Sequence, residues 1–389
     1  MLEENIVFTF FLIFSGAAVL ATFALYARQA LLVAYILLGV LLGPSALGWV
    51  GDPELIHDIA HIGIIFLLFL MGLELNPRDF LHLMKKTTVV TLASSIIFWS
   101  AGAALALAFG HPLLEAALIG AALIFSSTIV GLKLLPTTVL HHKRLGEIII
   151  SILLLQDFIA IALLVLLEGS GAAHNPMLEF GKLAAAVLLL ILGAWGFSRY
   201  VLLGLLGRFD TIREYIFLIA IGWCLSMAEA AAALGISHEI GAFAAGVTLA
   251  ANPISLYMSE NLKPLRDFFL VMFFFSLGAG FDLGMLGTVA LPATALAALT
   301  VFGKPVVFGY LLQRGGEQQH RAREVGARLG QMSEFSLLIA VLAVGKGQIG
   351  EQAGYLIQLA TLLTFLASTY LVVFRFPTPI ALSDRLRRD

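Results

Sequence analysis

The chain has 389 residues, of which 60% are hydrophobic and 12% are charged, and its formal net charge is −2. This composition excludes a soluble domain and predicts one polytopic helical membrane domain over residues 1–389. The sequence lacks the alternating pattern of outer-membrane barrels. Its single cysteine, Cys224, excludes a disulfide framework and a thiolate metal site.

Clusters of Gly, Pro and polar residues divide the chain into thirteen apolar segments. Most approach the roughly 20 residues that a membrane-spanning helix needs, whereas the second and ninth are short, which predicts tilt or interruption. Glu3 and Glu4 stand where a signal peptide would carry basic residues, so we expect the first segment to remain as a helix. The segments are 5–26, 30–43, 57–75, 86–109, 113–135, 146–167, 179–204, 212–234, 238–251, 265–282, 286–312, 325–345 and 353–374.

The basic residues predict the orientation of these segments. With the N-terminus outside, twenty of the 23 Lys and Arg residues fall on the cytoplasmic side, whereas Lys182 and Lys346 fall outside and Lys304 lies within a segment. This asymmetry follows the positive-inside rule. We therefore expect thirteen transmembrane helices in the cytoplasmic (inner) membrane, with the N-terminus outside and the C-terminus inside.

Short motifs recur about 207 residues apart, which predicts an internal repeat. The matched pairs are Gly39 with Gly246, Gly72 with Gly278 and Ser127 with Ser333. Seven segments separate the members of a pair, and because seven is odd the two halves cross the membrane in opposite senses. We expect repeat 1 at about 5–167, a linker helix at 179–204, repeat 2 at about 212–374 and a short cytoplasmic tail at 375–389.

Polar residues interrupt two helices at matching places of the repeat. Ser127 and Thr128 lie in the first break, and Ser333 and Glu334 lie in the second. Paired interruptions in inverted halves indicate a transporter site near the bilayer midplane. Ser127 and Thr128 are candidate cation ligands, although such residues also bond back to their own helix. Glu334 is expected to coordinate the ion or, more simply, to cap a half-helix.

One acidic residue, Asp157, lies in the middle of the apolar run 148–167. A carboxylate there costs about 2.5–3.5 kcal/mol on insertion scales, which indicates a functional group. We expect Asp157 to bind K⁺ or Na⁺ when ionised and to carry a proton when neutral. The neighbouring Gln156 is expected to coordinate the cation or to hold the carboxylate. Because burial favours the protonated acid and a nearby cation favours the ionised form, the two states can exchange near neutral pH.

The second intramembrane charge is Lys304. Across the repeat Asp157 maps onto Thr364 and Lys304 onto Phe98, so each charge is present in one half only. Lys304 either competes with the cation for Asp157 or braces the helices. The alternative is a purely structural salt bridge between Asp157 and Lys304.

Three other titratable residues have less defined roles. Glu229 is expected to face another helix from within its span, and its role stays open. His141 and His142 adjoin a basic loop, which explains them more simply than a pH sensor does.

Together the motifs resemble the Kef-type branch of the monovalent cation:proton antiporters, and the resemblance covers nearly the whole chain. The motifs are Gly72-Leu73-Glu74, Ser126-Ser127-Thr128, Leu155-Gln156-Asp157, Gly241–Val247, Phe274–Gly278 and Gly330–Phe335. The resemblance implies a NhaA/NapA-like inverted repeat with two crossed broken helices, a homodimer, and elevator-type alternating access. It also implies Asp157 as the ion and proton carrier and Lys304 as the lysine of the core. A Gln-Asp pair resembles the electroneutral, often potassium-handling members.

Kef proteins carry a nucleotide-binding regulatory domain after the last helix, and this sequence has no Gly-x-Gly-x-x-Gly motif after a strand. We therefore expect an unregulated form, a truncated chain, or a protein whose regulator is a separate domain or subunit. Beyond the lipid bilayer and a second copy, we expect no nucleic-acid partner and no cofactor other than the transported ions.

The sequence thus predicts an antiporter that exchanges K⁺, or Na⁺, for H⁺. A channel or uniporter and a non-transporting sensor on the same fold stay as alternatives, although no carbonyl-rich filter motif is evident. An enzyme is not expected, because the sequence contains no His-Glu-x-x-His and no intramembrane aspartyl or serine dyad.

Overall fold

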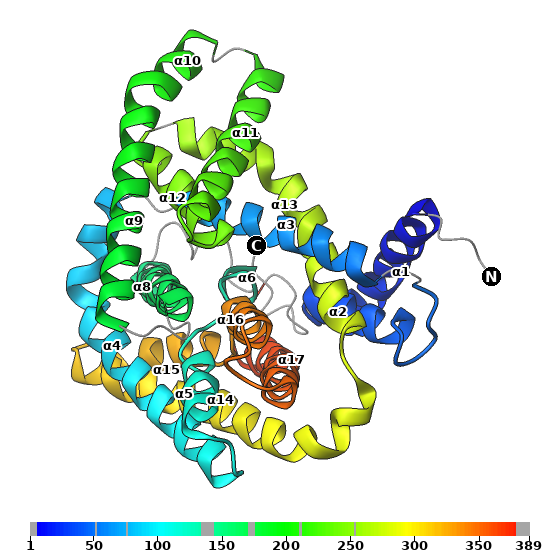
Figure 1. Ribbon diagram of the computed structural model, residues 1–389. Helices are drawn as coiled ribbons and strands as arrows, with labels where there is room; N and C mark the ends of the chain where they lie inside the picture. Colours follow the sequence, from blue (N-terminus) through cyan, green and yellow to red (C-terminus); the bar gives the residue numbers. More distant parts are fainter. Residues whose placement is uncertain are drawn as a thin grey trace. The chain divides into compact units, whose positions relative to one another are not determined.

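The computed structural model describes residues 6–50, 53–74, 77–133, 144–169, 176–209, 212–252 and 254–378. Within these ranges the chain is helical and contains no strand, which confirms the predicted all-α class (Figure 1). Among the described residues, 7 helices are long and apolar enough to cross a membrane, and shorter apolar helices accompany them. The count of thirteen transmembrane helices stays a prediction.

The described chain forms two compact units. Unit 1 comprises residues 1–14, 50–82 and 161–279, and unit 2 comprises residues 15–49, 83–160 and 280–389, of which only the described positions are considered. Three helices contribute to both units, namely α1 (Ile6–Tyr26), α4 (Pro77–Ala108) and α8 (Arg144–Gly169).

The core of unit 1 is built around α3, which packs against α12 and α13. A Cβ atom on Gly72 would collide with the backbone of α12, and one on Gly246 would collide with the backbone of α3. The two glycines therefore allow α3 and α12 to cross in direct backbone contact, which explains them by packing. The remaining helices of this unit are consecutive in sequence. Unit 1 contains α3 (Pro53–Glu74), α9 (Pro176–Phe197), the π-helix η1 (Ser198–Leu202), α10 (Leu203–Arg208), α11 (Arg213–Ala233), α12 (His238–Ala250) and α13 (Ile254–Ala279).

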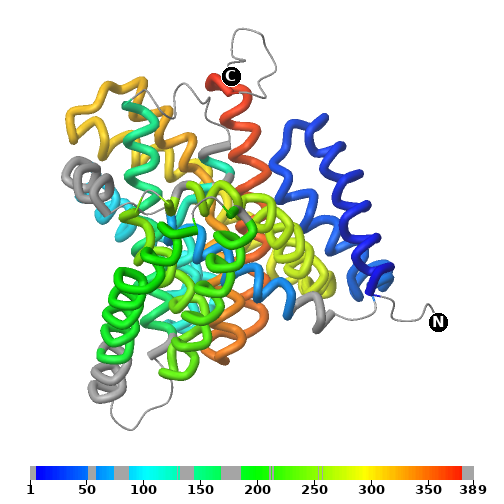
Figure 2. The backbone as a smooth tube through the Cα atoms, turned by 90° about the horizontal axis from the view of Figure 1, so that it is seen from above, coloured from blue at the N-terminus to red at the C-terminus, as the bar shows by residue number. Residues whose placement is uncertain are grey.

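Unit 2 contains the two interrupted helices and the long helices that hold them. α14 packs against both α15 and α17, and α17, red in Figure 2, also packs against α16. Besides its parts of α1, α4 and α8, the unit contains α2 (Leu31–Leu42), α5 (Leu113–Ala122), α6 (Thr128–Lys133), η2 (Leu283–Met285), α14 (Leu286–Arg314), α15 (Gln319–Arg328), α16 (Glu334–Gly345) and α17 (Glu351–Arg375).

The structure does not describe two parts of the chain for which the sequence made a prediction. These are the histidines His141 and His142 and the tail beyond residue 378.

Candidate functional site

Both predicted polar breaks interrupt a helix in unit 2. The first separates α5, which ends at Ala122, from α6, which begins at Thr128. The second separates α15, which ends at Arg328, from α16, which begins at Glu334. Each break leaves backbone groups that no helical hydrogen bond satisfies, so these groups need partners elsewhere.

The two breaks satisfy part of that need by bonding to each other. The Ser127 amide donates to the Met332 carbonyl over 3.0 Å, which joins the breaks backbone to backbone. Three side chains add further links. Ser126 Oγ donates to Leu329 O over 2.9 Å, Ser336 Oγ to Ala122 O over 2.6 Å and Gln331 Nε2 to Ser127 O over 3.4 Å. We call residues 123–127 and 329–333 together the crossing.

Lys304, from α14, binds both sides of the crossing. Its side chain is completely buried, and Nζ donates to Phe125 O over 2.6 Å, Gln331 O over 2.8 Å and Ser126 Oγ over 3.0 Å. An ammonium has three N–H donors, so all three are used. Nζ also lies 5.8 Å from the ring centroid of Phe98, the residue that the repeat pairs with Lys304. The geometry is that of a cation holding carbonyl oxygens together.

Gln156, from α8, clamps the first break. Its Oε1 accepts from the Ser126 amide and its Nε2 donates to Ile124 O, both over 3.0 Å, and the side chain is fully buried. The carbonyl oxygen and one N–H of this amide are therefore hydrogen-bonded to backbone and do not face an open cavity. Asp157 follows directly and is 3% exposed, so the buried carboxylate lies one residue from the clamp.

The hydroxyl groups of the first break differ in what they bind. Ser127 Oγ accepts from the Val130 amide over 3.1 Å and thereby caps α6. Thr128 Oγ1 is buried and has no hydrogen-bond partner among the described residues. An unpartnered buried oxygen is costly, so Thr128 is the better candidate for a cation ligand.

In the second break the cap of α16 is Ser333, and the expectation that Glu334 caps the half-helix is wrong. Ser333 Oγ accepts from the Phe335 amide over 3.2 Å, and Ser336 Oγ completes a capping box by accepting from the Ser333 amide. Glu334 is instead the first helical residue and is 4% exposed, where a negative charge meets the positive end of the helix dipole.

Two residues of α17 that the sequence reasoning missed hold the second break. Thr364 Oγ1 accepts from the Met332 amide over 3.0 Å, and Ser368 Oγ donates to Gln331 Oε1 over 2.9 Å. Their signal was available, because Thr361, Thr364 and Ser368 recur at helical spacing in an apolar segment. Thr364, the repeat counterpart of Asp157, does for the second break what Gln156 does for the first.

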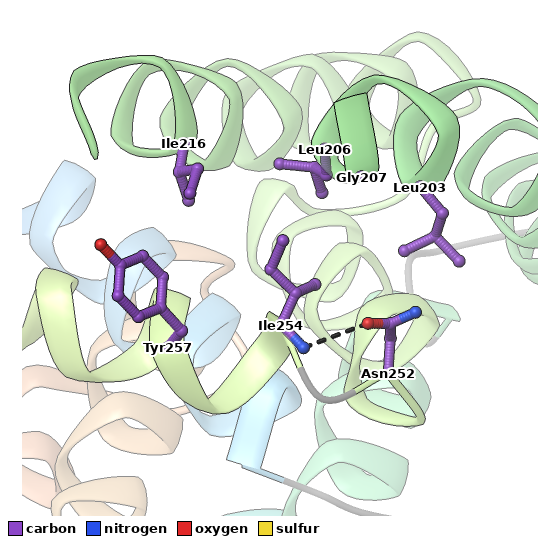
Figure 3. A pocket seen from close by; sticks show the side chains of 7 residues that line it. All are labelled: Leu203, Leu206, Gly207, Ile216, Asn252, Ile254 and Tyr257. Carbon is purple, nitrogen blue, oxygen red and sulfur yellow. Dashed lines mark hydrogen bonds between the residues drawn. The ribbon is translucent and has the colours of Figure 1, made fainter. Parts of the chain in front are cut away.

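Unit 1 holds a different polar contact, in which the buried carboxylate of Glu239 lies 2.9 Å from His61 Nε2. Its Glu229, on α11, has a 79% exposed side chain, and Oε1 lies 3.7 Å from Nε2 of His238, the first residue of the next helix, α12. A pocket of about 410 Å³ between α10, α11 and the start of α13 is lined mainly by apolar residues (Figure 3). Asn252 Oδ1 in that pocket already accepts from the Ile254 amide over 3.1 Å.

Most of the chain matches a family of membrane proteins. The family model of the transmembrane part of sodium/hydrogen exchangers matches residues 10–374, and the chain therefore belongs to that family. It is 30% identical over 362 residues to the "Putative cation/proton antiporter YbaL" of Escherichia coli, covering 88% of this chain and 63% of YbaL. It is 28% identical over 369 residues to the K(+) efflux antiporter 6 of Arabidopsis thaliana, covering 93% and 62% of the two chains. These matches confirm the resemblance to the membrane domain of Kef-type antiporters.

Two more comparisons bear on length and fold. The iron transporter MagA of Paramagnetospirillum magneticum is 30% identical over 353 residues, which cover 88% of this chain and 79% of MagA. The sodium proton antiporter MjNhaP1 of Methanocaldococcus jannaschii at pH 8 superposes with a TM-score of 0.65 at 17% identity, covering 94% of this chain and 95% of that one. That likeness shows a shared fold. The chain spans less than two thirds of the length of YbaL and of the Arabidopsis antiporter.

Proposed function

We propose that this chain exchanges one monovalent cation for one proton at Asp157, with K⁺ favoured over Na⁺. The observation that carries the proposal is the crossing: two broken helices bonded to each other, with the α8 residue next to Asp157 clamped onto the first of them. Family membership and the named cation antiporters among the relatives support the same activity.

The chemistry rests on one titrating carboxylate. When Asp157 is ionised it attracts a cation, and Thr128 Oγ1 and carbonyl oxygens of the crossing can replace part of the ion's water. When Asp157 takes up a proton, that attraction is lost and the cation leaves. Because Gln156 is neutral, Asp157 is the one group of the pair that gains or loses a proton. One monovalent cation is then exchanged for one proton, which makes the exchange electroneutral.

Lys304 acts in this proposal as a brace rather than as a competitor of the cation. α5 and α15 end at the crossing, so their last carbonyls bring partial negative charge there. The ammonium of Lys304 offsets that charge by bonding carbonyls on both breaks, and it does so from a fixed position. Asp157 is left as the group that changes charge.

Transport also requires that Asp157 become accessible from both sides of the membrane. We propose an elevator-type mechanism in which the bundle that carries the crossing exposes Asp157 alternately to the two sides of the cytoplasmic membrane. The N-terminus lies outside and the C-terminus inside.

We also propose a homodimer and a regulator supplied by a separate domain or subunit. An apolar groove of about 670 Å³ lined by residues of α9, α10 and α11 supports an assembly surface on unit 1, and the mass of the purified complex measured by light scattering tests the dimer.

The test compares Asp157→Asn with Asp267→Asn in proteoliposomes. Asp267 is a matched control, because it is an exposed carboxylate paired with Arg266. Cation and proton fluxes are followed together under K⁺ and Na⁺ gradients at several pH values. We expect Asp157→Asn to abolish exchange with unchanged folding and dimerisation, and Asp267→Asn to retain it.

The same fluxes separate the alternatives. A channel or uniporter would dissipate the cation gradient without moving protons, and a sensor would move neither ion. Full exchange in Asp157→Asn would remove the basis of the proposal.

A further inference from the structure

One face of α14 marks where unit 2 meets lipid. Phe302, Val306 and Tyr310 are 69%, 70% and 56% exposed, and their spacing of four residues places them along one side of the helix. Large exposed apolar side chains on a membrane helix contact acyl chains. Arg314 continues the series at the end of the span, and its guanidinium carbon lies 5.2 Å from the centroid of the Tyr310 ring. An aromatic ring followed by an arginine is typical of the membrane–water interface, so Arg314 lies at headgroup depth.

The next helix, α15, presents more arginine beside this point. Its Gly326 is so close to α14 that a Cβ atom would lie 2.7 Å from Pro305 O, which fixes one face of α15 against α14. Arg323 lies on the exposed side, and Arg321 is 30% exposed. We call Arg314, Arg321 and Arg323 the α15 arginine surface.

Acidic residues balance this surface only in part. Glu317 is shared, because it pairs with Arg321 over 2.8 Å and also with Arg144 at the start of α8. Glu324 is buried against Arg328 over 2.8 Å. Within the part of the chain that the structure describes, Arg314 and Arg323 have no acidic partner. Glu147, one turn into α8, is an exposed acid on the same helix as Arg144.

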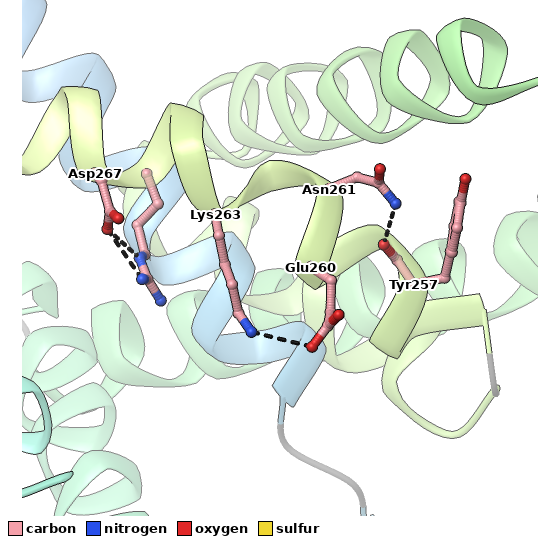
Figure 4. A network of polar contacts seen from close by, with 6 residues as sticks. Tyr257, Glu260, Asn261, Lys263 and Asp267 are labelled. Atoms are coloured by element: carbon pink, nitrogen blue, oxygen red, sulfur yellow. Dashed lines mark hydrogen bonds and ion pairs between the residues drawn. The ribbon is translucent and has the colours of Figure 1, made fainter. Parts of the chain in front are cut away.

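The two basic residues in the middle of α13 in unit 1 are different, because each has an acidic partner. Lys263 Nζ lies 3.1 Å from Glu260 Oε1, and Arg266 lies 3.0 Å from Asp267 Oδ1 (Figure 4). The α15 arginine surface therefore differs from this basic pair of α13 in carrying positive charge that no described acidic side chain offsets.

We propose that the α15 arginine surface binds the headgroup phosphate of an acidic phospholipid in the leaflet that it faces. Guanidinium groups bind phosphate oxygens with paired hydrogen bonds, and the lipid-facing stripe of α14 leads acyl chains to the same place. Each arginine near an anionic membrane surface contributes about 1 kcal/mol, which is about fivefold in affinity. α15 ends immediately before the second break, so a bound lipid also stabilises the helix that leads into the crossing.

The experiment measures the thermal unfolding midpoint of the purified full chain in detergent while phosphatidylglycerol or phosphatidylcholine is added. We expect phosphatidylglycerol to raise the midpoint more than phosphatidylcholine does, and salt to weaken the difference because the surface is exposed. In Arg314→Gln/Arg323→Gln the lipid concentration for half-maximal stabilisation should rise about 25-fold, as two contributions are lost. The control Lys263→Gln/Arg266→Gln should behave as the wild type.

Folding and ligand source are separated by further arms. Arg314→Lys/Arg323→Lys keeps the charges and should retain most of the lipid effect, even if the glutamine variant folds poorly. Equal effects of the two lipids, or an unchanged response of the glutamine variant, would overturn the proposal. So would inorganic phosphate that reproduces the stabilisation, because the site would then take a soluble anion. None of these readouts requires transport.

Discussion

Replacing Lys304 by methionine tests whether its ammonium holds the crossing together. Methionine keeps most of the apolar volume beside Phe98 but removes the three donors to Phe125 O, Gln331 O and Ser126 Oγ. Ser126 Oγ keeps its hydrogen bond to Leu329 O, so losing the bond from Lys304 costs this hydroxyl little. The carbonyls of Phe125 and Gln331, in contrast, lose a charged donor.

The magnitude follows from those two carbonyls. Each buried polar group left without its partner costs about 1–3 kcal/mol, which gives about 2–6 kcal/mol for the pair. Methionine also avoids the desolvation of a buried ammonium, so we expect the lower half of that range, about 2–4 kcal/mol. For a chain of this size each kcal/mol shifts the midpoint by about 2 °C, which predicts a loss of about 4–8 °C.

The assay is thermal unfolding of Lys304→Met beside Lys263→Met. Lys263 is a suitable control, because its ammonium pairs with Glu260 on the surface and its side chain is 46% exposed. We expect the control to change little, since exposed ion pairs contribute little to stability. If both variants unfold at the same temperature as the wild type, Lys304 is not the brace. In flux measurements we expect Lys304→Met to change the pH profile or stability more than the preference between Na⁺ and K⁺, and a changed ion preference with an unaltered pH profile would contradict this.

Three further substitutions test other contacts by the same unfolding assay. Gln156→Leu leaves the buried Ser126 amide and Ile124 carbonyl without their partner, so at about 1–3 kcal/mol for each group it should cost about 2–6 kcal/mol and lower exchange activity; normal stability and flux would show that the clamp is dispensable. Gly246→Ala forces α12 away from α3 and should destabilise by about 1–3 kcal/mol, whereas Gly222→Ala, with open space around its Cβ position, should be neutral or slightly stabilising; equal behaviour would refute the backbone contact. Arg328→Met leaves the buried carboxylate of Glu324 without its guanidinium and should cost about 3–5 kcal/mol, and an unchanged midpoint would mean that the pair contributes nothing.

Composition and motif spacing were enough to predict the class of this protein and the position of its unusual residues. Hydropathy and helical spacing are local properties, so they located the apolar segments and the two polar breaks without knowledge of the fold. The cost of a carboxylate in an apolar span likewise singled out Asp157 from the sequence alone. The repeat went one step further, because it paired two breaks that are 206 residues apart.

The contacts of those residues could be found only from the folded chain. Lys304 bonds atoms of both breaks, and Gln156 gives its amide to backbone instead of leaving it open to an ion. The cap of α16 belongs to Ser333 rather than to Glu334. Hydrogen bonds between residues about 180 to 200 positions apart depend on how the chain crosses itself, and periodicity along one helix carries no record of that crossing.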